Sequence, residues 1–163
     1  MVEAIETERL VLRRARIDDV AAMHRIMRDP TAMRYWSTLP HESVRQTADW
    51  VRSMIHPPDN NDDFIVTLDG ACIGKMGAWQ LPDFGYLLDP AHWGKGYASE
   101  ALAAFLAHRK RCGSAFLTAD TDPRNTASIR LLQRHGFVET GRAEKTWLIG
   151  GQWFDSIYWR KEL

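Results

Sequence analysis

The chain has 163 residues, 45% of them hydrophobic and 26% charged, which suits one folded domain over residues 1–163 and excludes a disordered chain. Lys plus Arg and Asp plus Glu count 21 each, so the formal net charge is zero. Because nonspecific nucleic-acid binding needs a basic excess, we expect no nucleic-acid partner.

The first half of the chain predicts a strand, two helices and a hairpin. Val20, Met23 and Ile26 recur at helical spacing. An Asp-Gly pair at 69–70 separates two apolar runs, which is a strong hairpin signal. The expected elements are a strand at 8–15, helices at 18–29 and 41–55, and strands at 64–68 and 71–80. The acidic, proline-bearing segment 56–63 is expected to be a loop, whose aspartates are either solvated or attract a cationic amine.

The second half predicts strands alternating with helices. Tyr97, Ala101 and Phe105 mark the apolar face of one helix, and Gly113 is a plausible residue to end it. The expected elements are a strand at 84–88, a helix at 96–112, a strand at 114–120, a helix at 125–135, and strands at 137–145 and 153–161. The strands on either side of the first of these helices should be parallel, so we expect a mixed sheet with helices on both faces.

A glycine-rich turn, DPAHWGKGYASEA, precedes the helix at 96–112. Glycines let the backbone approach a phosphate closely, and a helix N-terminus offers unpaired N–H groups and about half a positive charge. The Walker A pattern is absent from the sequence. A nicotinamide-dinucleotide site is disfavoured, because Ser99 stands where a third glycine is required and only about 43 residues follow Asp120. A plain structural loop is the other alternative.

Residues 93–98 resemble the acetyl-coenzyme A loop of the GNAT N-acetyltransferases, Gln/Arg-x-x-Gly-x-Gly/Ala, with Trp93 in the first position. Three further stretches, in the same order as in the Rim-type branch of that family, resemble its other motifs: ETERLVLRRARIDDV, NTASIRLLQRHGF and GGQWFDSIYWRKEL. The resemblance covers almost the whole chain. It implies an α/β (α+β) GNAT fold, with a mixed central sheet of about seven strands and about four flanking helices. It departs at Leu132, where many members carry a tyrosine as the acid for the thiolate.

The resemblance also implies acetyl-coenzyme A as co-substrate. The backbone amides of 94–99 would hold its pyrophosphate, with Lys95 adding charge, and the backbone of 86–88 would bind the pantetheine arm. Ser99 or Glu100 could instead only cap the helix, and Lys95 could be a solvated loop residue. The expected coenzyme-binding residues are Tyr86, Leu87, Leu88, Trp93, Gly94, Lys95, Gly96, Tyr97, Ala98, Ser99, Asn125 and Ser128.

Four residues are candidates for catalysis by the same resemblance. The N–H of Leu88 would stabilise charge on the thioester oxygen. Asp83 or Glu144 would act as the base that deprotonates the amine, unless they are solvated surface carboxylates. Ser128 is in place as the acid for the thiolate, but it also suits the first turn of a helix capped by Asn125.

The acceptor is poorly specified by the sequence. The segment 33–43 is placed over the acceptor cleft by the resemblance, and the candidate substrate residues are Tyr35, Trp36, Trp79 and Trp153. Each aromatic side chain could equally belong to the core.

We therefore expect an acetyl-coenzyme A-dependent N-acetyltransferase that acts on a primary amine: a protein N-terminus, a lysine or a small amine. The amine would attack the thioester directly in a ternary complex. A non-catalytic coenzyme A-binding module is the alternative. The two cysteines and six histidines follow no metal-ligand spacing, so we expect no metal. The N-terminus lacks an apolar signal core and no run approaches 18 apolar residues, so we expect no membrane partner and a cytoplasmic protein. Its oligomeric state is left open between a monomer and a homodimer.

Overall fold

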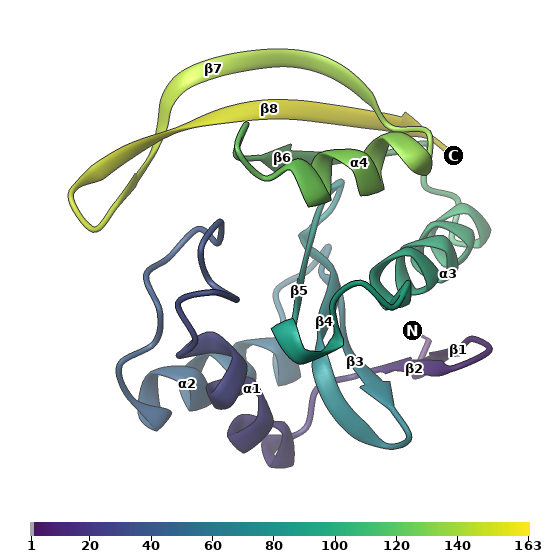
Figure 1. The fold of residues 1–163 in the computed structure, drawn as a ribbon. Helices are drawn as coiled ribbons and strands as arrows, with labels where there is room; N and C mark the ends of the chain where they lie inside the picture. Colours follow the sequence, from purple (N-terminus) through teal and green to yellow (C-terminus); the bar gives the residue numbers. More distant parts are fainter. Residues whose placement is uncertain (1) are drawn as a thin grey trace.

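An eight-stranded mixed sheet, ordered β1-β2-β3-β4-β5-β6-β8-β7, forms the centre of residues 2–163, which the computed structural model describes (Figure 1). The strands are β1 (Ala4–Glu6), β2 (Leu10–Arg13), β3 (Asp62–Leu68), β4 (Ala71–Gln80), β5 (Asp83–Leu88), β6 (Phe116–Thr121), β7 (Val138–Ile149) and β8 (Gln152–Glu162). The helices are α1 (Val20–Met27), α2 (Val44–Ile55), α3 (Tyr97–Arg111) and α4 (Thr126–Arg134), with short 3-10 turns η1 (Ile17–Asp19) and η2 (Pro90–His92).

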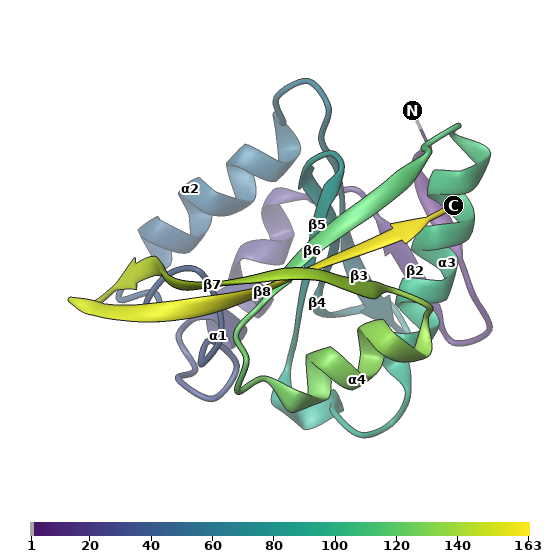
Figure 2. The same ribbon diagram turned by 90° about the horizontal axis from the view of Figure 1, so that it is seen from above.

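Helices cover both faces of the sheet, as the sequence predicts (Figure 2). Side chains alternate between the faces of a strand, and β3 shows the result. Phe64 and Val66 pack in a core with Phe105 of α3. Ile65, between them in sequence, packs in a second core with Met23 of α1. Each face of the central strands is therefore buried by its own pair of helices.

The expected number of strands was one too low, because β1 was missed. This strand has three residues and pairs antiparallel with β2, with Ile5 opposite Leu12. Three residues are too few to show a periodic pattern in the sequence. Its position in the structure comes from pairing with β2 and from burial of Ile5.

The expectation of a solvated acidic loop at 56–63 was wrong for its last two residues, which begin β3. Asp62 is buried and accepts hydrogen bonds from Arg14, His108 and Arg109. Asp63 is also buried. Buried carboxylates need such partners, and these partners come from distant parts of the chain.

The sheet opens between β5 and β6, the two strands joined through α3. They are parallel, as expected, but their ladder holds only one pair, Asp83 opposite Thr118. Beyond that pair the strands diverge toward their carboxyl ends, and α4 follows β6 on the far side of the opening (Figure 1). Many of the residues expected to bind the coenzyme lie along this gap.

Candidate active site

The main-chain groups of Tyr86 and Leu88 point into the gap between β5 and β6. Successive N–H and C=O groups of a strand point to alternate edges. The carbonyl oxygen of Pro82 accepts a hydrogen bond from the N–H of Thr118 on β6, at 2.9 Å. Tyr86 and Leu88 lie four and six residues after Pro82, so their N–H groups point to the same edge of β5 as the Pro82 carbonyl. Along this part of the edge β6 has already diverged. The indole N–H of Trp93 already donates to the carbonyl oxygen of Leu88, at 2.9 Å.

The turn after β5 leads directly into α3 and leaves its first amides exposed to the gap. Gly94 and Gly96 have φ angles of 71° and 82°, in the left-handed region that favours glycine. Gly96 is the N-cap residue of α3, and no side chain caps the helix there. Among the described residues, the first-turn N–H groups of α3 therefore have no side-chain partner and are suited to an anion.

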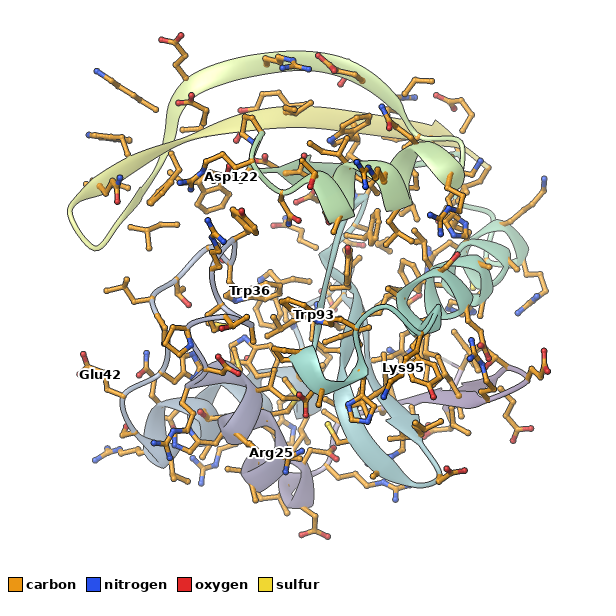
Figure 3. All side chains as sticks on the ribbon, viewed as in Figure 1. Arg25, Trp36, Glu42, Trp93, Lys95 and Asp122 are labelled. Atoms are coloured by element: carbon orange, nitrogen blue, oxygen red, sulfur yellow. The ribbon has the colours of Figure 1, made fainter. Side chains whose placement is uncertain are left out.

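A cavity of about 510 Å³ runs along this turn and the gap. All the expected coenzyme-binding residues line it except Lys95, whose ammonium instead donates to the carbonyl oxygen of Ala91, at 3.0 Å. Lys95 and Trp93 are labelled in Figure 3. The cavity is also lined by Arg124, Arg130 and Arg134. These three arginines were not among the predicted site residues, although Arg130 and Arg134 lie four residues apart on one face of α4.

Neither Ser99 nor Glu100 caps α3, so the capping alternative was wrong. The hydroxyl of Ser99 hydrogen-bonds Nε2 of His135, at 2.8 Å. Glu100 accepts hydrogen bonds from the Thr7 hydroxyl and from the main chain and side chain of Arg9. Burial alone would raise the pKa of Glu100, but these hydrogen bonds lower it. The turn between β1 and β2 is thereby tied to the start of α3.

A second cavity of about 730 Å³ lies on the other side of the gap, beneath the loop between α1 and α2. Of the candidate acceptor residues, Tyr35, Trp36 and Trp79 line it. Trp153 does not: it is half exposed, opposite Leu148 in the β7–β8 hairpin. Four aromatic residues that were not among the site candidates also line the cavity: Trp50, Phe84, Trp147 and Phe154. Figure 3 labels two residues that line this cavity: Trp36, in the loop between α1 and α2, and Asp122, in the segment that follows β6.

The floor of the second cavity carries a buried ion pair. Nζ of Lys75 lies 2.7 Å from Oδ1 of Asp63, and 5.8 Å from the ring centroid of Trp36. Gly85 lies beside them, and a Cβ added there would meet no atom within 4 Å. The glycine thus leaves open space where any other side chain would project into the cavity.

Two carboxylates line this cavity where β5 and β6 still pair. Asp83 accepts a hydrogen bond from the Thr118 hydroxyl, at 3.2 Å. Burial raises the pKa of Asp83, and the nearby Asp120 raises it further. Asp120 accepts hydrogen bonds from the Trp147 indole and the Ser156 hydroxyl. Glu144 is exposed on β7 and lines neither cavity.

The two cavities meet at six residues that line both: Arg34, Tyr35 and Trp36 from the loop after α1, and Tyr86, Asn125 and Ser128. Asn125 is the N-cap of α4, as expected, and its side-chain oxygen accepts from the Ser128 N–H at 3.2 Å. The hydroxyl oxygens of Tyr86 and Ser128 are 2.8 Å apart. Leu132, one turn after Ser128, lines the second cavity with an apolar side chain.

Comparison with known proteins identifies the family. The family model "Acetyltransferase (GNAT) domain" matches residues 9–138. The chain belongs to this family. The Bacillus licheniformis protein "Uncharacterized N-acetyltransferase p20" is 28% identical over 151 residues, covering 86% of this chain and 85% of the relative. Among solved structures, a GNAT-family acetyltransferase from Bacillus anthracis is 26% identical, with a TM-score of 0.84 and 98% of each chain covered.

A GNAT structure with bound coenzyme shares the fold. The RimL ribosomal L7/L12 alpha-N-protein acetyltransferase in complex with coenzyme A has a TM-score of 0.87 at 21% identity, covering 99% of this chain and 98% of that one. The GNAT fold is therefore confirmed. The match to the family model confirms an acetyl-coenzyme A-dependent N-acetyltransferase. The uncapped start of α3 and the outward N–H groups of β5 fit such a coenzyme.

Two features of residues 2–163 bear on possible partners. No cluster of three or more His, Cys, Asp or Glu side chains is arranged to hold a metal ion in this range. In the same range, every helix is too short or too polar to cross a membrane.

Proposed function

We propose that the cavity beneath the α1–α2 loop receives the acceptor amine, and that the cavity along α3 receives acetyl-coenzyme A. The amine then attacks the thioester directly where the cavities meet. The observation that carries this proposal is the shared lining by Tyr86, Asn125 and Ser128. Two substrates bound on opposite sides of the gap can reach each other there, and holding them in contact supplies much of the rate enhancement.

The coenzyme side of the proposal uses backbone groups. The amides at the start of α3 bind the pyrophosphate, and Gly94 and Gly96 let the turn approach it. The outward N–H groups of Tyr86 and Leu88 bind the arm and its acyl end. The N–H of Leu88 donates to the thioester oxygen as negative charge develops on it.

Asp83 is the proposed base, and Ser128 the proposed donor to the thiolate. An amine must lose a proton to act as a nucleophile, and a carboxylate with a raised pKa accepts that proton better than an ordinary one. Asp83 lines the acceptor cavity, whereas Glu144 does not. A water molecule would connect Asp83 to the amine, because the thioester lies farther along β5. Ser128 lies at the junction, on the coenzyme side of α4.

The lining of the acceptor cavity favours a cationic amine. Asp83, Asp120 and Asp155 line it, and within residues 2–163 none of these three forms a salt bridge. Aromatic rings surround them, and such rings attract cations through their negative faces. An acceptor that carries positive charge beyond the reacting nitrogen would therefore bind more tightly than a neutral one.

The test is an acceptor screen. Purified protein is incubated with acetyl-coenzyme A and a panel of peptide N-termini, lysine peptides, monoamines, diamines and polyamines, and thiol release and product mass are measured. Turnover with amines, faster for those with a second positive charge, supports the proposal. Stabilisation by the coenzyme without turnover on any amine would instead favour the non-catalytic binding module.

We further propose a single-domain, cytoplasmic protein that is a monomer or homodimer and needs no nucleic acid. Light scattering coupled to size-exclusion chromatography, with and without coenzyme, tests the oligomeric state.

A further inference from the structure

The phenol of Tyr86 crosses the gap from β5 to α4. Its hydroxyl oxygen lies 2.8 Å from the hydroxyl oxygen of Ser128, which is buried. This contact joins the two walls of the opening at the point where both cavities meet. Binding of the arm by the backbone of Tyr86 does not explain why its side chain reaches Ser128.

The two hydroxyl groups hold two protons but share one hydrogen bond. Within residues 2–163, neither hydroxyl has another hydrogen-bond partner. One O–H group is therefore left to point into the junction. A phenol is more acidic than an alkyl hydroxyl and is the better donor of the two. Burial raises the pKa of Tyr86, so the phenol stays protonated at neutral pH. With Tyr86 donating to Ser128, the remaining O–H belongs to Ser128.

We propose that Tyr86 is a positioning residue for acetyl transfer: its phenol donates to Ser128 and thereby aims the Ser128 O–H at the sulfur of the leaving thiolate. This inference rests on the proposed function. As the C–N bond forms and the C–S bond breaks, the C–S electron pair moves to sulfur, and the Ser128 O–H donates a hydrogen bond to it. Asp83 takes the proton of the amine through water, and this proton then returns through water to the sulfur, so the products are the amide and the free thiol. Linked hydroxyls polarise each other, so the Tyr86 donor strengthens the Ser128 donor.

A kinetic double-mutant cycle tests whether the Tyr86 hydroxyl acts through the Ser128 hydroxyl. Tyr86→Phe removes only the phenolic oxygen, and Ser128→Ala removes only the serine hydroxyl. Each should lower kcat about tenfold or more, with little change in the coenzyme dissociation constant, because the lost hydrogen bond forms fully only to a charged sulfur. Since Tyr86 acts through Ser128, the double variant should be no slower than Ser128→Ala alone. Tyr158→Phe, on the exposed part of β8, is the matched control and should keep full activity.

A spectroscopic measurement separates this role from a structural one. The absorbance of the coenzyme A thiolate in the complex is followed as a function of pH, and the absorbance of the desulfo-coenzyme A complex is subtracted. This titration gives the pKa of the bound thiol. It should be about one pH unit or more higher in both single variants than in the wild type, because the donor to the thiolate is lost.

The outcomes separate the inference from the proposed function. The inference is overturned if an active wild type and Tyr86→Phe share the same kcat and bound-thiol pKa, or if the two substitutions act additively. Absence of turnover on every amine would refute the proposed function. The pKa of the bound thiol would still show whether Tyr86 strengthens the hydrogen bond to the thiolate.

Discussion

Nζ of Lys75 lies 2.7 Å from Oδ1 of Asp63, and both side chains are almost completely buried, at 4% and 2% exposure. Removing one partner would leave the other as an uncompensated buried charge. Lys75→Met should therefore destabilise the protein by about 3–5 kcal/mol. Urea unfolding measures this change. Lys75→Met combined with Asp63→Leu is the control, and it should cost less than the sum of the two single variants. Additive costs would contradict a coupled pair.

Gly96→Glu should weaken acetyl-coenzyme A binding by about tenfold or more, because it places a side chain on a left-handed backbone and a negative charge at the pyrophosphate site. Calorimetry measures the dissociation constant. Gly113→Glu is the matched control, since Gly113 follows the other end of α3 with a nearly identical φ of 81°. It should cost similar stability and leave coenzyme affinity intact. Equal losses of affinity in both variants would argue against pyrophosphate binding at Gly96.

Asp83→Asn should slow acetyl transfer by about a hundredfold, because positioned general bases contribute about that much or more. Asp120→Asn should have a different effect. Since burial and then Asp120 raise the pKa of Asp83, removing the second charge should move the acid limb of the kcat/KM profile to lower pH. Profiles over the acidic range measure the shift. If Asp83→Asn left the rate unchanged, Glu144→Gln would be the next variant to examine.

The same carboxylate should affect stability in a pH-dependent way. The pKa of Asp83 is raised in the folded protein, so its contribution to stability is fully present below its unfolded pKa and is lost as pH rises through the folded value. Asp83→Asn should thus be more stable than the wild type at neutral pH. The difference should shrink below about pH 4, where aspartates protonate in the unfolded chain. Thermal unfolding at several pH values measures it, and a difference independent of pH would refute the linkage.

Gly85→Val should raise the KM for the amine roughly tenfold without changing coenzyme affinity. Its Cβ would meet no atom within 4 Å, and Gly85 lines the acceptor cavity but not the coenzyme cavity. Steady-state kinetics with each substrate varied in turn measure both constants. If the variant instead lost affinity for the coenzyme, this cavity would bind the coenzyme, which would contradict the proposed assignment of the two cavities.

Most helices and strands were predictable, because their signals are local. The Asp-Gly turn and the cap of Asn125 each lie within a few residues of the element they define. The glycine turn before α3 was also predictable, because glycines mark such a turn locally. The uncapped helix start was not, because distant residues bind the side chains of Ser99 and Glu100. The three-residue β1 was missed because its pairing with β2, rather than its own pattern, makes it a strand.

The composition of the site depended on contacts between distant residues. The sequence indicated Tyr86 as a backbone contact and Ser128 as a hydroxyl donor, but it could not reveal that the two hydroxyls meet across 42 positions. It suggested Trp153 for the acceptor cavity, whereas the twist and register of the β7–β8 hairpin bring Trp147 and Phe154 there.

The amino-acid sequence by itself determined the order of elements from β2 onward, the glycine turn before α3 and the family resemblance, because periodicity, capping and glycine conformation act over a few residues. Only the tertiary structure decided which charges are buried as pairs and which side chains line each cavity. Those outcomes depend on how β5 and β6 diverge and on which helices and loops pack across the gap. Because a charge loses its hydration when it is buried, each buried charge needs a partner, as Lys75 has in Asp63.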